Sequence, residues 1–301
     1  MLSAETIARI KALDLRGRHM ATDLMSGDYA SAFHGRGMEF HEVREYVPGD
    51  DVRGIDWNVT ARMNQPFIKV FREERELTVM LLVDISASLA SGLSRSRKDA
   101  SAELAAVIAW LAIRGNDRVG LMLFGQSVEL YVPPRKGQGH VWRIIRDVMT
   151  WTQQGKASNI DSALDQVAKV VKRRAVCFVI SDFLSGSIAK SLGRVAMQHD
   201  VTCVHMGQDP LDGAIATQSG KFFGGGVSVF VDRETGELVE VDTSSSSSRK
   251  AIIEAHHTRI KNLEDVVRKS GADMFTVASN HSAIDPLAAY LRQHQGRRKK
   301  S

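Results

Sequence analysis

The stretch LTVMLLVDISAS, residues 77–88, decides the fold of this chain. Its first seven residues are apolar apart from one threonine, and an acidic and two hydroxyl side chains follow at once. A short continuous apolar run is typical of a strand that is buried on both faces, as in a parallel sheet. We therefore expect a central strand at residues 77–83, with Asp84 at its carboxyl end.

Strands and helices alternate along the chain after this stretch. Apolar runs predict further strands at residues 118–124, 175–180, 201–206 and 273–277. Helical spacing predicts helices near residues 96–114, 140–150, 159–171, 187–199, 250–269 and 284–293. This alternation indicates an α/β fold with a mostly parallel, Rossmann-type sheet and helices on both faces.

The remaining segments complete the expected organisation. They are an amphipathic helix at residues 4–25, an irregular charged segment at 26–65, a β-like pair of 67–71 with 77–83, a loop around Pro133 and Pro134, a hairpin around 233–236 and a flexible serine connector at 244–248. We therefore divide the chain into an N-terminal helix and irregular segment (residues 1–74), an α/β domain with a hairpin insertion near 222–248 (residues 75–294) and a basic tail (residues 295–301).

Polar side chains gather where two of the expected strands end. Asp84, Ser86 and Ser88 follow the first strand, and Asp182 follows the strand at 175–180. Ser158 precedes a helix and can deliver a hydroxyl to the same edge. Ligands of open α/β sheets bind at the carboxyl ends of the strands, near the reversal in strand order. We expect these five residues to lie together there.

Two carboxylates and three hydroxyls form an oxygen-only ligand set, which suits a hard divalent cation such as Mg²⁺, or Mn²⁺ or Ca²⁺. Because few of these ligands are anionic, a bound ion would still attract a carboxylate from a protein partner. The local field before metal binding is expected to be negative. The alternative is that Ser86 and Ser88 cap the next helix and Asp84 is an ordinary polar residue at a strand end.

The order of Asp84, Ser86, Ser88, Ser158 and Asp182 resembles the metal-ion-dependent adhesion site of von Willebrand factor A domains. In that family a first loop supplies the D-x-S-x-S pattern, a second loop a threonine and a third loop an aspartate. The resemblance implies that the five residues bind the metal. Ser158 departs from the pattern because it stands where threonine is usual.

A longer resemblance covers nearly the whole chain. The string REYVPGDDVRGIDW at residues 44–57, with Ala61 and Arg62, is similar to the signature of the bacterial domain-of-unknown-function family 58. So are the segments PPRKG (133–137), SDF (181–183), DP (209–210) and ETG (234–236). The chain departs from that family at Asp212, where glutamate is usual, and in its serine run. The resemblance implies an adaptor or chaperone-like partner of a MoxR-type AAA+ ATPase.

The signature segment has two interpretations from its residues alone. Its arginines and aspartates could form ion pairs that pin an irregular loop in place, since arginine meets carboxylates bidentately. The same surface could instead dock a partner or serve regulation. The residues concerned are Arg44, Arg53, Arg62, Asp50, Asp51 and Asp56.

Composition and charge restrict the class of protein. The 40 Lys and Arg against 35 Asp and Glu give a net charge of +5, and the last ten residues alone hold five basic side chains and no acidic one. The body is therefore formally neutral, which argues against a nucleic-acid partner. The longest uninterrupted apolar stretch, residues 104–113, is half the length that a membrane span needs. Cys177 and Cys203 lie in apolar runs, as buried thiols of a cytoplasmic protein would.

The leading hypothesis is a non-enzymatic, Mg²⁺-dependent adaptor that binds a partner carboxylate through its metal. One alternative is a metal-assisted hydrolase of the phosphoesterase type, with a metal-bound water as the nucleophile. Another is a structural module that keeps a vestigial metal site.

Overall fold

The computed structural model describes residues 4–25, 39–63, 65–72, 76–86, 97–152, 158–184, 186, 188–207, 227–231, 238–242, 245–278 and 282–298. The chain forms two compact units. We call Met1–Ala32 with Thr78–Ser301 the sheet unit, and Phe33–Leu77 the signature unit. Each is described by itself.

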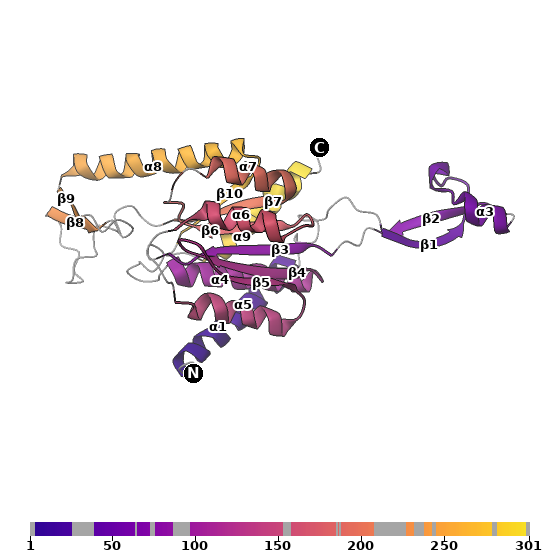
Figure 1. Ribbon diagram of the computed structural model, residues 1–301, viewed down its shortest axis with the longest axis horizontal. Coiled ribbons are helices and arrows are strands. Elements are labelled where there is room, and N and C mark those ends of the chain that lie inside the picture. The colour runs from indigo at the N-terminus through magenta and orange to yellow at the C-terminus, as the bar shows by residue number, and fades with distance from the viewer. Residues whose placement is uncertain are drawn as a thin grey trace. The chain divides into compact units, whose positions relative to one another are not determined.

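The sheet unit contains a six-stranded sheet in the order β10-β7-β6-β3-β4-β5 (Figure 1). Its strands are β3 (Thr78–Asp84), β4 (Arg118–Phe124), β5 (Val128–Arg135), β6 (Val176–Ser181), β7 (Asp200–Gly207) and β10 (Asp273–Ala278). All neighbours pair in parallel except β4 and β5. This confirms the α/β fold class with a mostly parallel, Rossmann-type sheet.

Strand β3 lies at the centre because it can be buried on both faces. Every residue from Val79 to Asp84 is buried, which agrees with the apolar run that predicted the strand. The chain leaves β3 first toward β4 on one side and returns later as β6 on the other. The strand order therefore reverses between β3 and β6, and this reversal opens the sheet edge at which α/β proteins bind ligands.

Helices cover both faces of the sheet. Helices α6 (Ile160–Val170), α7 (Ala189–Gln198) and α8 (Ser246–Lys269) share one buried core with the sheet. Helices α4 (Arg97–Arg114), α5 (Gln138–Thr150) and α9 (Ile284–Arg298) pack on the other face. Cys177 and Cys203 are buried free thiols, as expected. Among the helices of the described residues, none has the length and apolar character needed to cross a bilayer.

Three local predictions were wrong. The expected proline loop is the edge strand β5, where Pro133 and Pro134 are tolerated because an edge strand need not donate every N–H. The described part of the expected serine connector begins α8, because the Ser245 hydroxyl caps the Ser248 N–H at 3.5 Å. Helix α9 also runs to Arg298, into the expected tail.

The insertion is described only in part. Strands β8 (Val227–Val231) and β9 (Leu238–Asp242) pair antiparallel, which confirms the predicted hairpin. Its turn at residues 233–236 lies outside the described residues, as do the family motif at 209–210, Asp212 and Ser244.

Helix α1 (Ala4–Met25) forms as predicted but belongs to the sheet unit, so the structure divides the chain differently from the boundary drawn at residue 74. Its Ile10 is fully buried. The Trp110 indole of α4 donates to the Asp14 carboxylate at 3.0 Å, and the Arg18 guanidinium lies 4.5 Å from the indole ring. The apolar stripe of α1 therefore finds its partner in α4, not in the segment that follows it.

The signature unit is more regular than its sequence suggested. Strand β1 (Glu39–Glu45) pairs antiparallel with β2 (Phe67–Arg72), and η1 (Val52–Gly54) and α3 (Trp57–Met63) lie between them in the chain. The expected pairing of 67–71 with 77–83 is therefore wrong. Strand β2 pairs instead with β1, which forms within the segment that was expected to be irregular.

The ion pairs expected in the signature unit form in part. The Arg44 guanidinium binds Asp50 with two nitrogens, at 2.8 and 2.7 Å, and Asp50 also accepts the Val47 N–H at 3.0 Å. These bonds close the turn at Pro48 and Gly49. Arg53 pairs with Asp51 on the surface, where such pairs contribute little. Trp57 is 70% exposed, so the docking interpretation stays open beside the structural one.

Gly120 of β4 gives a test of the packing beneath the edge strand. A Cβ at this position would lie 2.6 Å from the Met80 sulfur and 3.0 Å from Pro134 Cγ. We expect Gly120→Ala to lower the free energy of unfolding by about 1–3 kcal/mol in urea titrations, because a crowded core must shift. Gly139→Ala on α5 is the matched control: a Cβ there meets nothing within 4 Å, so unfolding should be unchanged or slightly harder. Equal stabilities of the two variants would contradict the packing.

Candidate functional site

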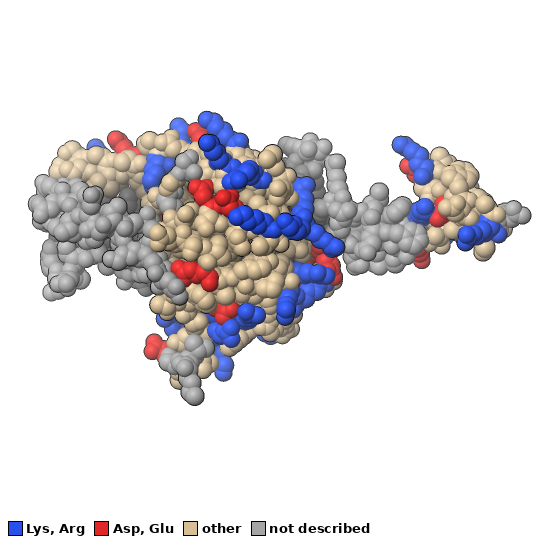
Figure 2. All heavy atoms as spheres, viewed as in Figure 1, with Lys and Arg blue, Asp and Glu red and all other residues tan. Residues whose placement is uncertain are grey.

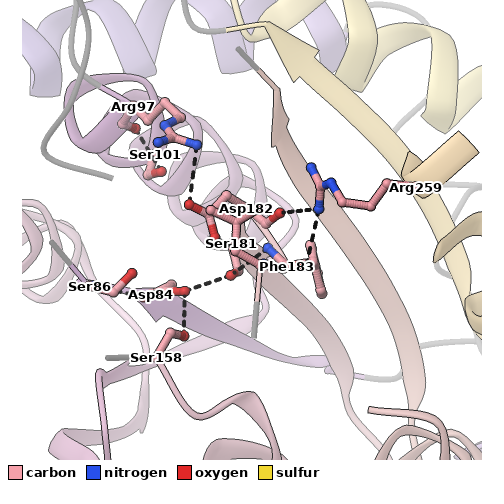
Figure 3. Close-up of polar contacts among 10 residues, drawn as sticks. Asp84, Ser86, Arg97, Ser101, Ser158, Ser181, Asp182, Phe183 and Arg259 are labelled. Atoms are coloured by element: carbon pink, nitrogen blue, oxygen red, sulfur yellow. Dashed lines mark hydrogen bonds and ion pairs between the residues drawn. The ribbon is translucent and has the colours of Figure 1, made fainter. Parts of the chain in front are cut away.

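The two central strands bring Asp84 and Ser181 together at the edge where the strand order reverses. Asp84 is the last residue of β3 and Ser181 the last of β6, and the two strands are hydrogen-bonded in parallel as far as Val83 and Ile180. Ser158 reaches the same edge from the start of α6, because the Asn159 N–H donates to the Gly125 carbonyl just beyond β4 at 2.8 Å. Three segments distant in sequence therefore converge (Figure 3).

The Asp84 carboxylate is the centre of this cluster and is only 2% exposed. Its Oδ2 accepts hydrogen bonds from the hydroxyls of Ser158 at 2.7 Å and Ser181 at 2.6 Å. Its Oδ1 accepts the backbone N–H of Ser86 at 2.8 Å. The three donors come from three segments distant in sequence, and one carboxylate holds these segments together.

Burial raises the pKa of the Asp84 carboxyl above its usual value, because a low-dielectric interior disfavours the charged form. The hydrogen bond from Ser181 opposes this shift, and the nearby negative charge of Asp182 adds to it. Asp84 is thus a carboxylate whose surroundings do not fully balance its charge.

Asp182 is the second buried carboxylate, and Arg97 is its partner. The Arg97 Nη1 lies 3.2 Å from Asp182 Oδ2, while Oδ1 accepts the Leu184 N–H at 3.3 Å. Arg97 is in the first turn of α4, where the Ser101 hydroxyl donates to its carbonyl at 2.8 Å. The sequence did not point to Arg97, because the surrounding run of basic and serine residues resembles a solvated surface.

A second arginine reaches the same loop from α8. The Arg259 Nη1 lies 3.5 Å from the Asp182 carbonyl and 3.3 Å from the Phe183 carbonyl. Phe183 is buried with φ at 51°, a left-handed conformation that is rare for a large side chain. Arg259 thus supports the backbone of a loop with an unfavourable conformation, and no motif in the sequence indicated this role.

His205 of β7 lies beside Ser181 in the register of the sheet. Burial and the neighbouring Arg259 lower the pKa of His205 to about 3, so the imidazole is neutral at ordinary pH. Its Nδ1 lies 3.4 Å from the Thr276 hydroxyl. His205 therefore adds no charge to the edge.

The structure brings four of the five predicted ligands to one edge: Asp84, Ser86, Ser158 and Asp182. Ser88 lies outside the described residues. The oxygen-only donor set is of the kind that a hard cation prefers. Within the described part of the chain no group of three or more His, Cys, Asp or Glu that could hold a metal is found, at this edge or elsewhere. That the residues bind a metal stays a prediction.

The expectation of a negative local field needs correction. The Arg97 guanidinium pairs with the Asp182 carboxylate and Arg259 bonds the Asp182 backbone carbonyl, so one of the two carboxylates of the edge already has cationic neighbours. On the visible surface of the sheet unit, basic and acidic side chains also lie side by side (Figure 2). The negative charge of the edge is therefore offset at Asp182, whereas the donors to Asp84 among the described residues are neutral.

Comparisons with known proteins agree with these features. The family model described as "Protein of unknown function DUF58" matches residues 42–261. The uncharacterized protein Rv1480 of Mycobacterium tuberculosis is 34% identical over 210 residues, which is 68% of this chain and 66% of that protein. The uncharacterized protein Mb1516 of Mycobacterium bovis matches equally well. The match thus spans just under two thirds of these relatives' length.

Solved structures with a related fold show much lower identity. An aerotolerance-related membrane protein from Bacteroides fragilis is 15% identical, with a TM-score of 0.46 over 73% of this chain and 99% of that one. BatB from Bacteroides thetaiotaomicron is 15% identical, with a TM-score of 0.47 over 72% and 98%. The SpRpn10 VWA domain is 12% identical, with a TM-score of 0.38 over 71% and 94%.

The raised pKa of Asp84 predicts a pH dependence of stability. Its stabilising contribution is complete below the unfolded value of 3.8 and is lost as the pH rises through the higher folded value. Asp84→Asn cannot ionise, so in chelator its free energy of unfolding should exceed that of the wild type at pH 7, and the gap should narrow toward pH 4. Urea titrations across this range measure it. The half-exposed Asp165→Asn is the control, and a gap that does not narrow would contradict the prediction.

Proposed function

This chain belongs to the DUF58 family, and from that premise we propose that it is a non-enzymatic, Mg²⁺-dependent adaptor that binds a protein partner at the carboxyl edge of its sheet. The observation that carries the proposal is the buried Asp84, which accepts hydrogen bonds from three separate segments of the chain beside a second buried carboxylate. Such a site holds oxygen atoms in place at the position where α/β sheets bind ligands.

The residues that would hold the ion are Asp84, Ser86, Ser158 and Asp182, with Ser88 from the sequence pattern. A bound Mg²⁺ supplies a concentrated positive charge that attracts a carboxylate of the partner. The chain's own part is to orient these oxygens: Ser158 and Ser181 fix the position of Asp84, and the Leu184 N–H fixes that of Asp182.

The rim of the edge also supports a protein partner. Leu184 is two residues from Asp182 and is 48% exposed. Exposure of an apolar side chain to water is unfavourable, so a protein surface that covers it gains binding free energy. The combination of an anion-binding ion and an adjacent apolar contact suits an acidic side chain presented by a protein.

A non-enzymatic role is the simpler interpretation of the hydroxyl groups. Both the Ser158 and the Ser181 hydroxyls donate to Asp84, which holds them in structural hydrogen bonds. His205, whose pKa is lowered to about 3, is a weak base, and its Nδ1 contact is with Thr276 and not with either serine. The family resemblance adds the proposal that the partner is a MoxR-type AAA+ ATPase.

The test is capture of a MoxR-type ATPase from the same source by immobilised chain in Mg²⁺. Asp84→Asn and Ser158→Ala should each reduce the affinity at least tenfold, because each removes an oxygen ligand or its charge. Thr150→Ala is the control, since that hydroxyl only bonds Arg146 within α5. Comparing variants at one Mg²⁺ concentration avoids chelator, which would also affect nucleotide binding by the ATPase.

Full capture by both site variants would rule out the metal-dependent mechanism. A phosphoesterase assay with Mg²⁺ and Mn²⁺ belongs in the same series, because turnover that is lost in Asp84→Asn would instead favour the hydrolase alternative.

A further inference from the structure

We infer that Arg97 is the counter-ion of Asp182 in the metal-free protein, and that its guanidinium and a divalent cation compete for this carboxylate, so that Arg97 sets the metal affinity of the edge. The inference rests on the proposed function, because it assumes that the edge binds a divalent cation. It assigns a role to a residue that the adhesion-site pattern does not include.

The first support is burial. The Arg97 side chain points to Asp182 (Figure 3). The Arg97 side chain is 10% exposed and the Asp182 side chain 1% exposed, so the pair is withdrawn from water. Charges in such a setting interact strongly and are screened little by salt. A buried arginine is also costly to leave without an anion, which accounts for its contact with Asp182.

The second support is the form of the contact. Arg97 reaches Asp182 through one nitrogen at 3.2 Å, whereas Arg44 holds Asp50 with two nitrogens at 2.8 and 2.7 Å. Bidentate pairs are the strong ones. The longer single contact leaves lone pairs of Asp182 accessible to another cation, so the pair is suited to exchange.

The third support is the balance of charge. The Asp182 carboxylate is paired with Arg97, and Arg259 lies against the backbone carbonyl of the same residue. A divalent cation bound at this edge would therefore lie close to the positive charge of Arg97, which is paired with Asp182. Like charges at short range weaken binding. Removing Arg97 removes this repulsion and frees Asp182.

Arg259 does not take the same role. It donates to the backbone carbonyls of Asp182 and Phe183, so its contacts leave the carboxylate of Asp182 unoccupied. A metal can therefore bind without displacing Arg259, whereas it meets Arg97 at the carboxylate itself. Arg97 is therefore the cation that competes with the metal, and Arg259 is the one that supports the loop.

The experiment is a titration of the purified full chain with Mn²⁺, in which binding is measured by calorimetry and by the electron paramagnetic resonance signal of the free ion. Arg97→Gln and Arg97→Met should bind Mn²⁺ about tenfold more tightly than the wild type, because both remove the charge. Arg97→Met fills a similar volume and serves if the glutamine variant does not fold. Arg97→Lys keeps the charge and should stay within about threefold of the wild type.

The matched control is Arg174→Gln, which breaks the exposed pair of Arg174 with Asp200 at the start of β7 and should leave Mn²⁺ affinity unchanged. Equal or weaker binding by both neutral Arg97 variants, with the wild type binding normally, would overturn the inference and leave the proposed function intact. No binding by any variant or by the wild type would overturn both. Binding by the neutral variants alone would support the competition but contradict a metal-dependent wild type.

Discussion

The burial of Asp84 at the end of β3 is the constraint on which the rest of this edge depends. A carboxylate with 2% exposure needs hydrogen-bond donors, and the chain supplies them from the loop after β3, the last residue of β6 and the segment before α6. The same bonds that satisfy Asp84 therefore fix the relative positions of these loops. They also bring the oxygens of the candidate metal site together. The hydrogen bonds that stabilise the buried carboxylate are therefore the same ones that position the candidate ligands.

Electrostatics distinguishes the two carboxylates. Asp84 is surrounded by neutral donors, and burial raises its pKa. Asp182 is contacted from two helices. Arg97 of α4 binds its carboxylate, and Arg259 of α8 donates to the backbone carbonyls of Asp182 and Phe183. The positively charged groups that matter here are not in the basic C-terminal segment that dominates the net charge. They are two arginines that the overall composition does not distinguish from any others.

The fold was largely predictable because its central elements have unambiguous patterns. The apolar strands and long helices appear at the expected positions, since a strand buried on both faces must be apolar throughout. The errors fall where tertiary partners decide the outcome. Pro133 and Pro134 suggest a loop but fit an edge strand, and β2 found its partner in β1 because only the folded signature unit brings the two together.

The sequence by itself determined the strand that ends at Asp84, the identity of the oxygen-bearing residues and the sheet edge at which they meet. A strand buried on both faces is recognisable from its apolar run, and the carboxyl ends of parallel strands share one edge. Only the tertiary structure decided which cations face that edge. Arg97 is 85 residues from Asp182 in the chain, and Arg259 is 77 residues from it. An arginine has the same appearance in a sequence whether it lies in water or against a buried carboxylate, because its partner is set by the packing of helices and not by its neighbours in the chain.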